Sequence, residues 1–243
     1  GENQLGTGLI DPAAGFAYFT TVTNLPDTVV KIDLATFTRV GSLTLSSASR
    51  VSAAVIDPAA GFAYFGSNSV SRIVDKVDLA TFTDVGTLTL NTGETFLSSA
   101  VIDSAAGFAY FGTGTSPGIV VKVNLATFTR DSAFTFNAGE NTVSSGVIDP
   151  AAGFAYFGTA TSPGRIVKVN LATFTRAATE VLNAGENALR SGVIDTTSGH
   201  AYFGTENSPG KVIRIPLGLG SHGTWSWSYT ADDGPAQSQN VTI

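Results

Sequence analysis

Four glutamates and three threonines recur in similar surroundings and are the first residues of this chain that could do chemistry. The glutamates lie in segments rich in Gly and Asn and are Glu2, Glu94, Glu140 and Glu186. The threonines lie in segments of the form GTxxSPG and are Thr113, Thr159 and Thr205. Carboxylates and hydroxyls that share one face of a protein can hold a sugar by hydrogen bonds. Exposed polar loops are nevertheless the default for such segments, and the sequence favours that simpler interpretation.

An aspartate also recurs, in segments such as "VIDPAAG". These residues are Asp11, Asp57, Asp103, Asp149 and Asp195. A ring of carboxylates could bind a metal ion. A turn explains more of the segment, because Asp accepts hydrogen bonds from the turn backbone, Pro presets φ and Gly takes the left-handed conformation. We therefore expect a turn here and no metal site.

Residues for acid–base and nucleophilic catalysis are scarce. The chain has two histidines, His200 and His222, and neither belongs to an H-E-x-x-H or H-x-H pair. The sequence contains no G-x-S-x-G elbow and no phosphate-binding P-loop. His200 stands where other repeats have Phe, so we interpret it as a core or rim residue. We expect no catalytic residue, no metal and no cofactor, and hence no enzyme.

The positions of these residues follow a constant period. The Ile-Asp pair begins at residue 10 and again at 56, a step of 46, which then repeats to 102, 148 and 194. Self-similarity at such a period is typical of repeat architectures. Within one period, short segments rich in Val, Ile, Phe, Tyr and Thr alternate with Gly, Pro, Asn and Asp, which predicts four strands. The sequence therefore predicts an all-β fold, a five-bladed β-propeller of 46-residue, four-stranded blades.

Aromatic and basic residues also keep their places in the repeat. Phe154, Tyr156 and Phe157 put aromatic rings on both faces of the second expected strand, which predicts a sheet buried on both sides. A basic residue stands near the end of every third expected strand, and these residues are Lys31, Lys76, Lys122, Lys168 and Arg214. We interpret them as strand-edge charges that discourage wrong pairing.

Composition restricts the class of partner. A chain with 43% hydrophobic and 13% charged residues is not of the disordered class. A net charge of −6 and a pI near 4.8 remove the electrostatic reason to expect nucleic acid or an anionic membrane as a partner. No apolar run approaches the ~20 residues that span a bilayer. The chain lacks Cys and begins at Gly1 without a signal peptide, so we expect no disulfides and a mature or trimmed start.

The units "VIDPAAGFAYFGT" and "PGRIVKVNLATFTR" resemble the YVTN-type β-propeller repeats of bacterial and archaeal surface-layer and other cell-surface proteins. The resemblance covers about residues 1 to 217. The segment "AYFGT" stands where that family has its Tyr-Val-Thr-Asn tetrapeptide, so the match is to the wider group. The resemblance implies a secreted or surface-displayed module. It implies little about a ligand, because propellers host enzymes, lectins and scaffolds.

The chain divides into a propeller over residues 1–217 and a C-terminal extension over residues 218–243. In the extension, Trp225, Trp227 and Tyr229 alternate with Ser, which predicts a half-buried strand. We expect this strand to be the outer strand of blade five, or the extension to begin a bacterial Ig-like surface domain, which it resembles. An outer strand exchanged with another chain would instead make filaments by strand addition.

These features predict a non-catalytic structural or interaction module of an extracellular or cell-surface bacterial protein, with protein partners or self-association. Two alternatives stay open. A lectin-like propeller would bind glycans through the repeated glutamates and threonines. A lactonase-like propeller enzyme would need a cluster of acids and histidines that breaks the repeat, and the sequence shows none.

Overall fold

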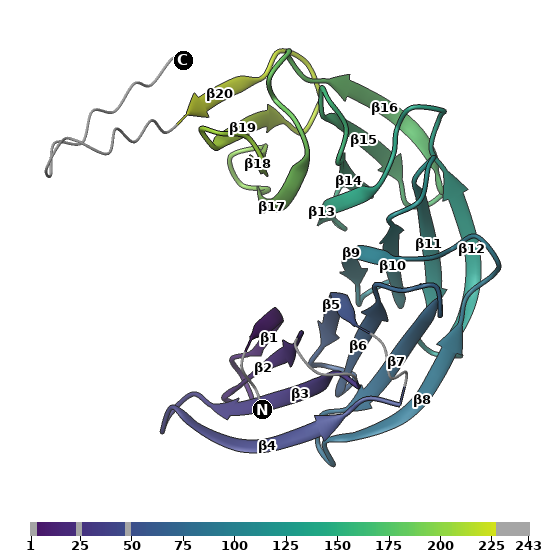
Figure 1. Cartoon of the computed structure of the whole chain (residues 1–243), viewed down its shortest axis with the longest axis vertical. Coiled ribbons are helices and arrows are strands. Elements are labelled where there is room, and N and C mark those ends of the chain that lie inside the picture. Colours follow the sequence, from purple (N-terminus) through teal and green to yellow (C-terminus); the bar gives the residue numbers. More distant parts are fainter. Residues whose placement is uncertain (1–3, 23–25, 47–49, 227–243) are drawn as a thin grey trace, which may run out of the picture. The chain divides into compact units, whose positions relative to one another are not determined.

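The computed structural model describes residues 4–22, 26–46 and 50–226, and all regular structure in them is β. The strands β1 to β20 form five antiparallel sheets of four strands each, in chain order within every sheet. We call these sheets blades one to five (Figure 1). The predicted all-β, five-bladed β-propeller is confirmed. The described residues contain no helix with the length and apolar character that a bilayer crossing requires.

Each blade consists of four consecutive strands. Blade one comprises β1 (Leu5–Asp11), β2 (Phe16–Thr21), β3 (Thr28–Asp33) and β4 (Thr38–Thr44). Blade two comprises β5 (Val51–Asp57), β6 (Phe62–Ser67), β7 (Ile73–Asp78) and β8 (Thr83–Thr89). Blade three comprises β9 (Leu97–Asp103), β10 (Phe108–Thr113), β11 (Ile119–Asn124) and β12 (Thr129–Thr135). Blade four comprises β13 (Val143–Asp149), β14 (Phe154–Thr159), β15 (Arg165–Asn170) and β16 (Thr175–Val181). Blade five comprises β17 (Leu189–Asp195), β18 (His200–Thr205), β19 (Lys211–Pro216) and β20 (Gly223–Ser226).

The first turn of each blade follows from the repeated Asp and Gly. Asp149 Oδ1 accepts a hydrogen bond from the Ala152 N–H at 3.0 Å, and Gly153 has a φ of +77°, which favours glycine. Equivalent bonds form at Asp11, Asp57, Asp103 and Asp195. The turn interpretation of the repeated aspartates is confirmed, because their side chains bind the turn backbone.

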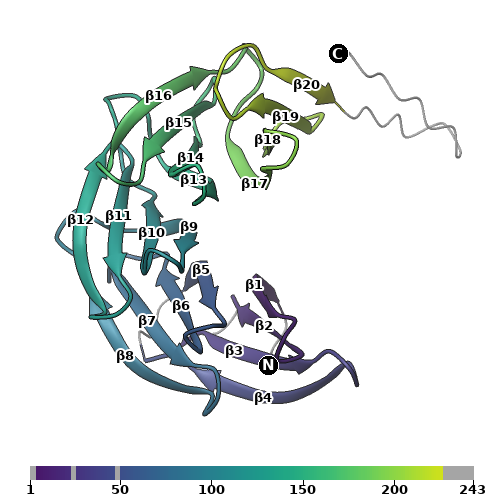
Figure 2. The same ribbon diagram turned by 180° about the vertical axis from the view of Figure 1, so that it is seen from behind.

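The chain forms two compact units. The first comprises residues Gly1–Thr115 and Ile119–Thr135 and contains blades one to three. The second comprises Ser116–Gly118 and Phe136–Ile243 and contains blades four and five. In the first unit β1, β5 and β9 are neighbours, and in the second unit β13 is the neighbour of β17 (Figure 1 and Figure 2). Adjacent blades within a unit therefore meet along their first strands.

The core of each unit lies between adjacent blades. In the first unit, Tyr64 of blade two and Phe111 of blade three belong to one cluster and are 1% and 0% exposed. In the second unit, Tyr156 of blade four and Phe203 of blade five also belong to one cluster, and they are 1% and 0% exposed. Side chains alternate between the faces of a strand, so Tyr and Phe one position apart serve opposite interfaces. The expectation that the second strands are buried on both faces is confirmed for blades two to four.

Blade five receives its fourth strand from its own chain. β20 pairs with β19 and places the half-buried Trp225 opposite Val212. The other residues of the expected strand, Trp227 and Tyr229, lie outside the described residues. The division of the chain at residue 217 and an Ig-like domain after it stay predictions.

Candidate functional site: carboxylate latches of the connecting loops

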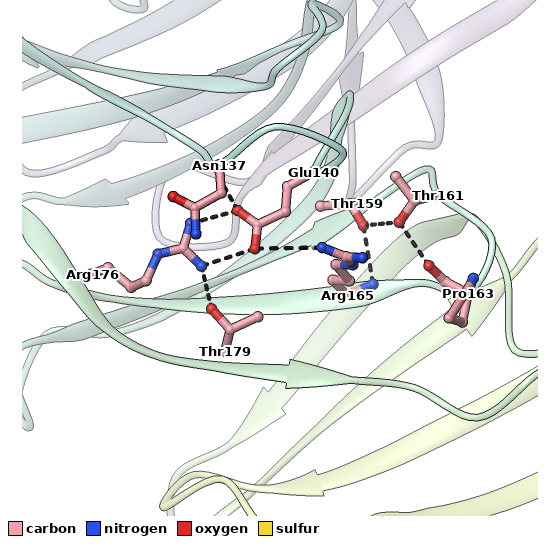
Figure 3. Close-up of polar contacts among 8 residues, drawn as sticks. All are labelled: Asn137, Glu140, Thr159, Thr161, Pro163, Arg165, Arg176 and Thr179. Carbon is pink, nitrogen blue, oxygen red and sulfur yellow. Dashed lines mark hydrogen bonds and ion pairs between the residues drawn. The ribbon is translucent and has the colours of Figure 1, made fainter.

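The loop that leads into β13 carries Glu140, one of the glutamates predicted to bind a ligand, and the protein encloses its carboxylate. Its side chain is 3% exposed. The Asn137 N–H donates to Oε2 at 2.8 Å, and Arg176 Nη1 and Nη2 donate to Oε1 and Oε2 at 3.0 and 2.5 Å (Figure 3). Arg176 lies on β16, the fourth strand of blade four. The pair is bidentate, which is the strongest geometry for an arginine and a carboxylate.

The same arrangement occurs in the first unit. Glu94 precedes β9, and Arg130 lies on β12, the fourth strand of blade three. Arg130 Nε donates to both carboxylate oxygens at 2.9 Å, and its Nη2 donates to Oε1 at 2.6 Å. The hydrogen bond to Glu94 raises the pKa of Arg130. We call each such pair a latch: the carboxylate of a connecting loop bound to the fourth strand of the blade that the loop enters.

The third latch uses a histidine in place of arginine. His222 Nε2 lies 2.8 Å from Glu186 Oε2, and Thr224 of β20 also donates to this carboxylate. Burial by itself would raise the pKa of Glu186, but hydrogen bonds from Thr224, the Asn183 backbone and His222 outweigh burial and lower it. The latch therefore favours the ionised carboxylate and joins β20 to the loop that enters blade five.

His222 bridges two carboxylates rather than offering them to a common ligand. Its Nδ1 lies 3.2 Å from Glu180 Oε1, on the other edge of the ring from Glu186. One ion cannot be bound by both carboxylates and a ring nitrogen in that arrangement. Among the residues that the structure describes, no group of three His, Asp or Glu side chains is placed to hold a metal ion.

In the loop before β5 the roles are exchanged: the loop residue is the hydrogen-bond donor and the fourth strand carries the carboxylate. Asp84 of β8 stands one period of 46 residues before Arg130 and is an acceptor. Its Oδ2 accepts hydrogen bonds from the N–H and the hydroxyl of Ser46 at 3.0 and 2.6 Å. Glu2, the remaining predicted glutamate, lies outside the described residues.

Sequence reasoning missed the partners of these glutamates. Each glutamate precedes its partner by 36 residues, from 94 to 130, from 140 to 176 and from 186 to 222. That constant spacing between a glutamate and an arginine or histidine is the signal that could have found them. It was missed because 36 residues separate a loop from a distant strand, and only the sheet order brings them together.

The predicted threonines close their own loops. The Thr159 hydroxyl accepts a hydrogen bond from the Arg165 N–H at 3.0 Å (Figure 3). Equivalent bonds join Thr113 to the N–H of Ile119 and Thr205 to the N–H of Lys211. Thr113 and Thr159 are fully buried. Their hydroxyls thus shape the loop between the second and third strands.

Among the predicted glutamates and threonines that the structure describes, five are buried: Glu94, Glu140, Glu186, Thr113 and Thr159. Glu94, Glu140 and Glu186 are 4%, 3% and 3% exposed, and each is bound to its latch partner. A sugar could reach these carboxylates only if a latch opened. Their chemistry is that of buried ion pairs and hydrogen bonds that position loops, and a carbohydrate site formed by them stays a prediction.

Lysines of the third strands form a second repeated contact. Lys31 Nζ lies 4.0 Å from the centroid of the Phe16 ring and 5.5 Å from that of Phe82, and it donates to the Leu79 carbonyl at 3.3 Å. Three further lysines lie over the equivalent phenylalanines: Lys76 over Phe62, Lys122 over Phe108 and Lys168 over Phe154. The interpretation of these lysines as edge charges was wrong. The third strand is paired on both sides, and the ammonium makes cation–π contacts instead.

Comparison with known proteins identifies the fold and no family. No family model matches the chain, and no curated protein matches it. Solved structures do match, 1342 chains in all, among them hydrazine synthase of Kuenenia stuttgartiensis. That match has a TM-score of 0.76 and 13% identity, and it covers 93% of this chain and 66% of the other.

A match of so low an identity shows a shared fold alone, because one fold hosts many unrelated functions. The fold and the repeated latches define the class of this protein, a repeat protein with the β-propeller fold. The YVTN resemblance and the Ig-like resemblance of the extension stay predictions.

Proposed function

We propose that this protein is a non-catalytic structural and interaction module of an extracellular or cell-surface assembly. One observation carries this function: the repeated glutamates bind an arginine or a histidine of the same chain. The pairs are Glu94 with Arg130, Glu140 with Arg176, and Glu186 with His222. Residues that recur because each blade must be joined to the next need no ligand to explain them.

Position outside the cell is supported by the resemblance of residues 1–217 to repeats of cell-surface proteins. A membrane-impermeant reagent applied to intact host cells is expected to label the protein. Labelling that occurs only after lysis would contradict the extracellular location and leave the structural role to be tested separately.

The structural role predicts that an open latch lowers stability. Arg176→Ala removes the bidentate partner of the buried Glu140 carboxylate and leaves Arg165, whose Nη1 lies 4.0 Å from Oε1. We expect a loss of at most about 3 kcal/mol in the free energy of unfolding. Glu140→Gln keeps an acceptor for the Asn137 N–H and leaves an arginine side chain that is 23% exposed and can reach water. We expect about 1 kcal/mol for that change. Thermal and urea unfolding followed by circular dichroism measure both losses.

An exposed ion pair provides the matched control. Arg190 and Glu206 are bonded, but their side chains are 50% and 60% exposed. Glu206→Gln is therefore expected to change stability by less than about 0.5 kcal/mol. Saturable glycan binding that Glu140→Gln abolishes without a change in stability would contradict the structural role and favour the lectin-like alternative.

A further inference from the structure

The latch of blade five differs from the other two in the chemistry of its basic residue. Arg130, Arg176 and His222 follow one another at steps of 46 residues, so they occupy one position of the repeat. Arginine stays charged up to about pH 12, whereas imidazole is the side chain that changes charge between about pH 5 and 8. The histidine therefore gives blade five a dependence on pH that the two arginine latches lack.

Carboxylates lie at both edges of the His222 ring. Nδ1 lies 3.2 Å from Oε1 of Glu180, which belongs to β16, and Nε2 lies 2.8 Å from Oε2 of Glu186, in the loop that enters blade five. The side chains of His222 and Glu186 are 6% and 4% exposed, so water has little access to the shorter contact. All three residues belong to the second compact unit.

This arrangement requires a positive charge on the ring. Ionised carboxylates only accept hydrogen bonds, and a neutral imidazole has one donor nitrogen and one acceptor nitrogen. Both contacts are hydrogen bonds only if both ring nitrogens carry a proton. Burial by itself raises the pKa of Glu186. Hydrogen bonds from Thr224, the Asn183 backbone and His222 outweigh burial and lower this pKa, so the carboxylate is ionised at neutral pH.

The other polar groups near the ring do not replace its charge. Asn183 Nδ2 lies 3.1 Å from Nε2, and a half-turn of the amide presents its oxygen to a protonated ring nitrogen instead. Two cations stand on β19: a Cβ at Gly185 would lie 3.6 Å from Lys211 Nζ, and a Cβ at Gly223 would lie 3.7 Å from Arg214 Nη2. Lysine and arginine remain charged at about pH 9, so a change of charge at neutral pH belongs to the ring.

We propose that the protonation of His222 controls how firmly β20 is attached to blade five. His222 immediately precedes β20, and Thr224 of β20 donates to the same Glu186 carboxylate. The charged ring binds Glu180 of blade four and Glu186 of the connecting loop at once. As pH rises, the ring loses a proton and turns a lone pair toward one carboxylate, so that contact becomes repulsive and β20 separates from β19 more often.

This switch rests on the proposed structural role and deepens it, because it states the condition under which one latch opens. The sign follows from the charge of the ring. Protonation closes the latch and loss of the proton weakens it, so attachment of β20 is firmest on the acidic side of neutrality, where the ring is charged and the carboxylates are still ionised.

Hydrogen exchange of the full chain tests the switch. The backbone amides of residues 211–226 are followed at about pH 6, 7.5 and 9, the range in which imidazole loses its charge. Protection factors remove the effect of pH on exchange itself. We expect protection to fall at least about tenfold from the lowest to the highest pH, the factor that one charge-assisted hydrogen bond supplies. Residues 165–181, which contain β15 and the latch partner Arg176, are the control within the same chain and are expected to keep their protection.

Two substitutions separate the charge of the ring from its size. His222→Arg installs the residue of the other two latches, keeps a cation throughout this range of pH and is expected to abolish the fall. Glu180→Gln gives Nδ1 an amide that can either donate or accept, so both forms of the ring are satisfied and we expect a fall of less than about threefold. Circular dichroism checks that each variant is folded, and either variant by itself tests the switch.

The histidine signals in the proton NMR spectrum connect the effect to one ring. The chain has two histidines, so the signal of His222 is the one that is missing from His222→Arg. It is expected to titrate over the same range of pH in which protection of residues 211–226 falls.

Two results would overturn this switch. One is equal protection of residues 211–226 at all three pH values, and the other is a fall that His222→Arg retains in full. Neither result bears on the proposed function, which is tested at a single pH by Arg176→Ala and by glycan binding.

Discussion

At the scale of single residues, burial changes the pKa of tyrosines that occupy the same position in successive blades. Tyr64, Tyr110 and Tyr156 are each 1% exposed. Burial raises the pKa of each phenol to about 12, and neighbouring aspartates add to the effect. The Tyr156 hydroxyl also donates to the Leu217 carbonyl at 2.8 Å, a bond that a phenolate cannot make. The neutral phenol is thus part of the interface between blades four and five.

We expect stability to fall as pH rises from 10 to 12. In that range unfolded chains, with the ordinary pKa of 10.0, release a proton that the folded chain retains, so ionisation favours unfolding. Each buried tyrosine contributes roughly 2 to 3 kcal/mol to this loss by pH 12. Urea unfolding at several pH values, with tyrosinate absorbance recorded in parallel, measures the effect. Tyr64→Phe is expected to make the loss shallower, and an unchanged dependence on pH would contradict this account.

Single residues also show how far the sequence could predict the candidate site. The turn role of Asp149 was predictable because Asp, Pro and Gly lie within one short segment. The burial of Glu140 was not, since its partner Arg176 is 36 residues away. A polar residue in a Gly-rich loop is expected to be exposed unless the strand that covers it is already known.

At the scale of elements, the turn between the third and fourth strands is a packing device. Phe37, Phe82 and Phe128 have φ values of +52°, +52° and +50°, a left-handed backbone that is costly for a side chain of this size. Phe128 packs against Tyr64 of blade two with ring centroids 5.8 Å apart. The packing of the ring on the preceding blade offsets the cost of the backbone.

Glycine at two of these positions separates packing from backbone strain. Phe128→Gly relieves the backbone but loses the contact with Tyr64, and we expect a net loss of about 2 kcal/mol. Phe37→Gly relieves the same backbone where the ring is 85% exposed, and we expect no loss, or a gain of up to about 1 kcal/mol. Urea unfolding at low protein concentration compares the two. Equal losses would show that the ring contributes nothing to the interface in blade three.

At the scale of the whole molecule, stability is a sum over blades and the contacts between neighbours. The fourth strand of the last blade, β20, is held by its pairing with β19 and by the latch to Glu186. Its loss would leave β19 as an unpaired edge, which is a site for association with another chain.

Removal of residues 222–243 is therefore expected to lower the melting temperature by several degrees or to produce aggregates. Removal of residues 227–243 keeps β20 and is the matched control. Differential scanning calorimetry and light scattering measure the two outcomes. If both truncations lower the melting temperature equally, the strand and its latch do not stabilise blade five.

The sequence by itself determined the repeat, the strands, the aspartate turns and the class of fold. Each of these is local or periodic, and strand propensity, turn chemistry and a step of 46 residues can be read without knowing which segments touch. Only the tertiary structure decided which charges are buried and where the lysines point. Those properties depend on contacts between elements far apart in the chain, and the same glutamate is a solvated loop residue or a buried latch according to the strand that lies over it.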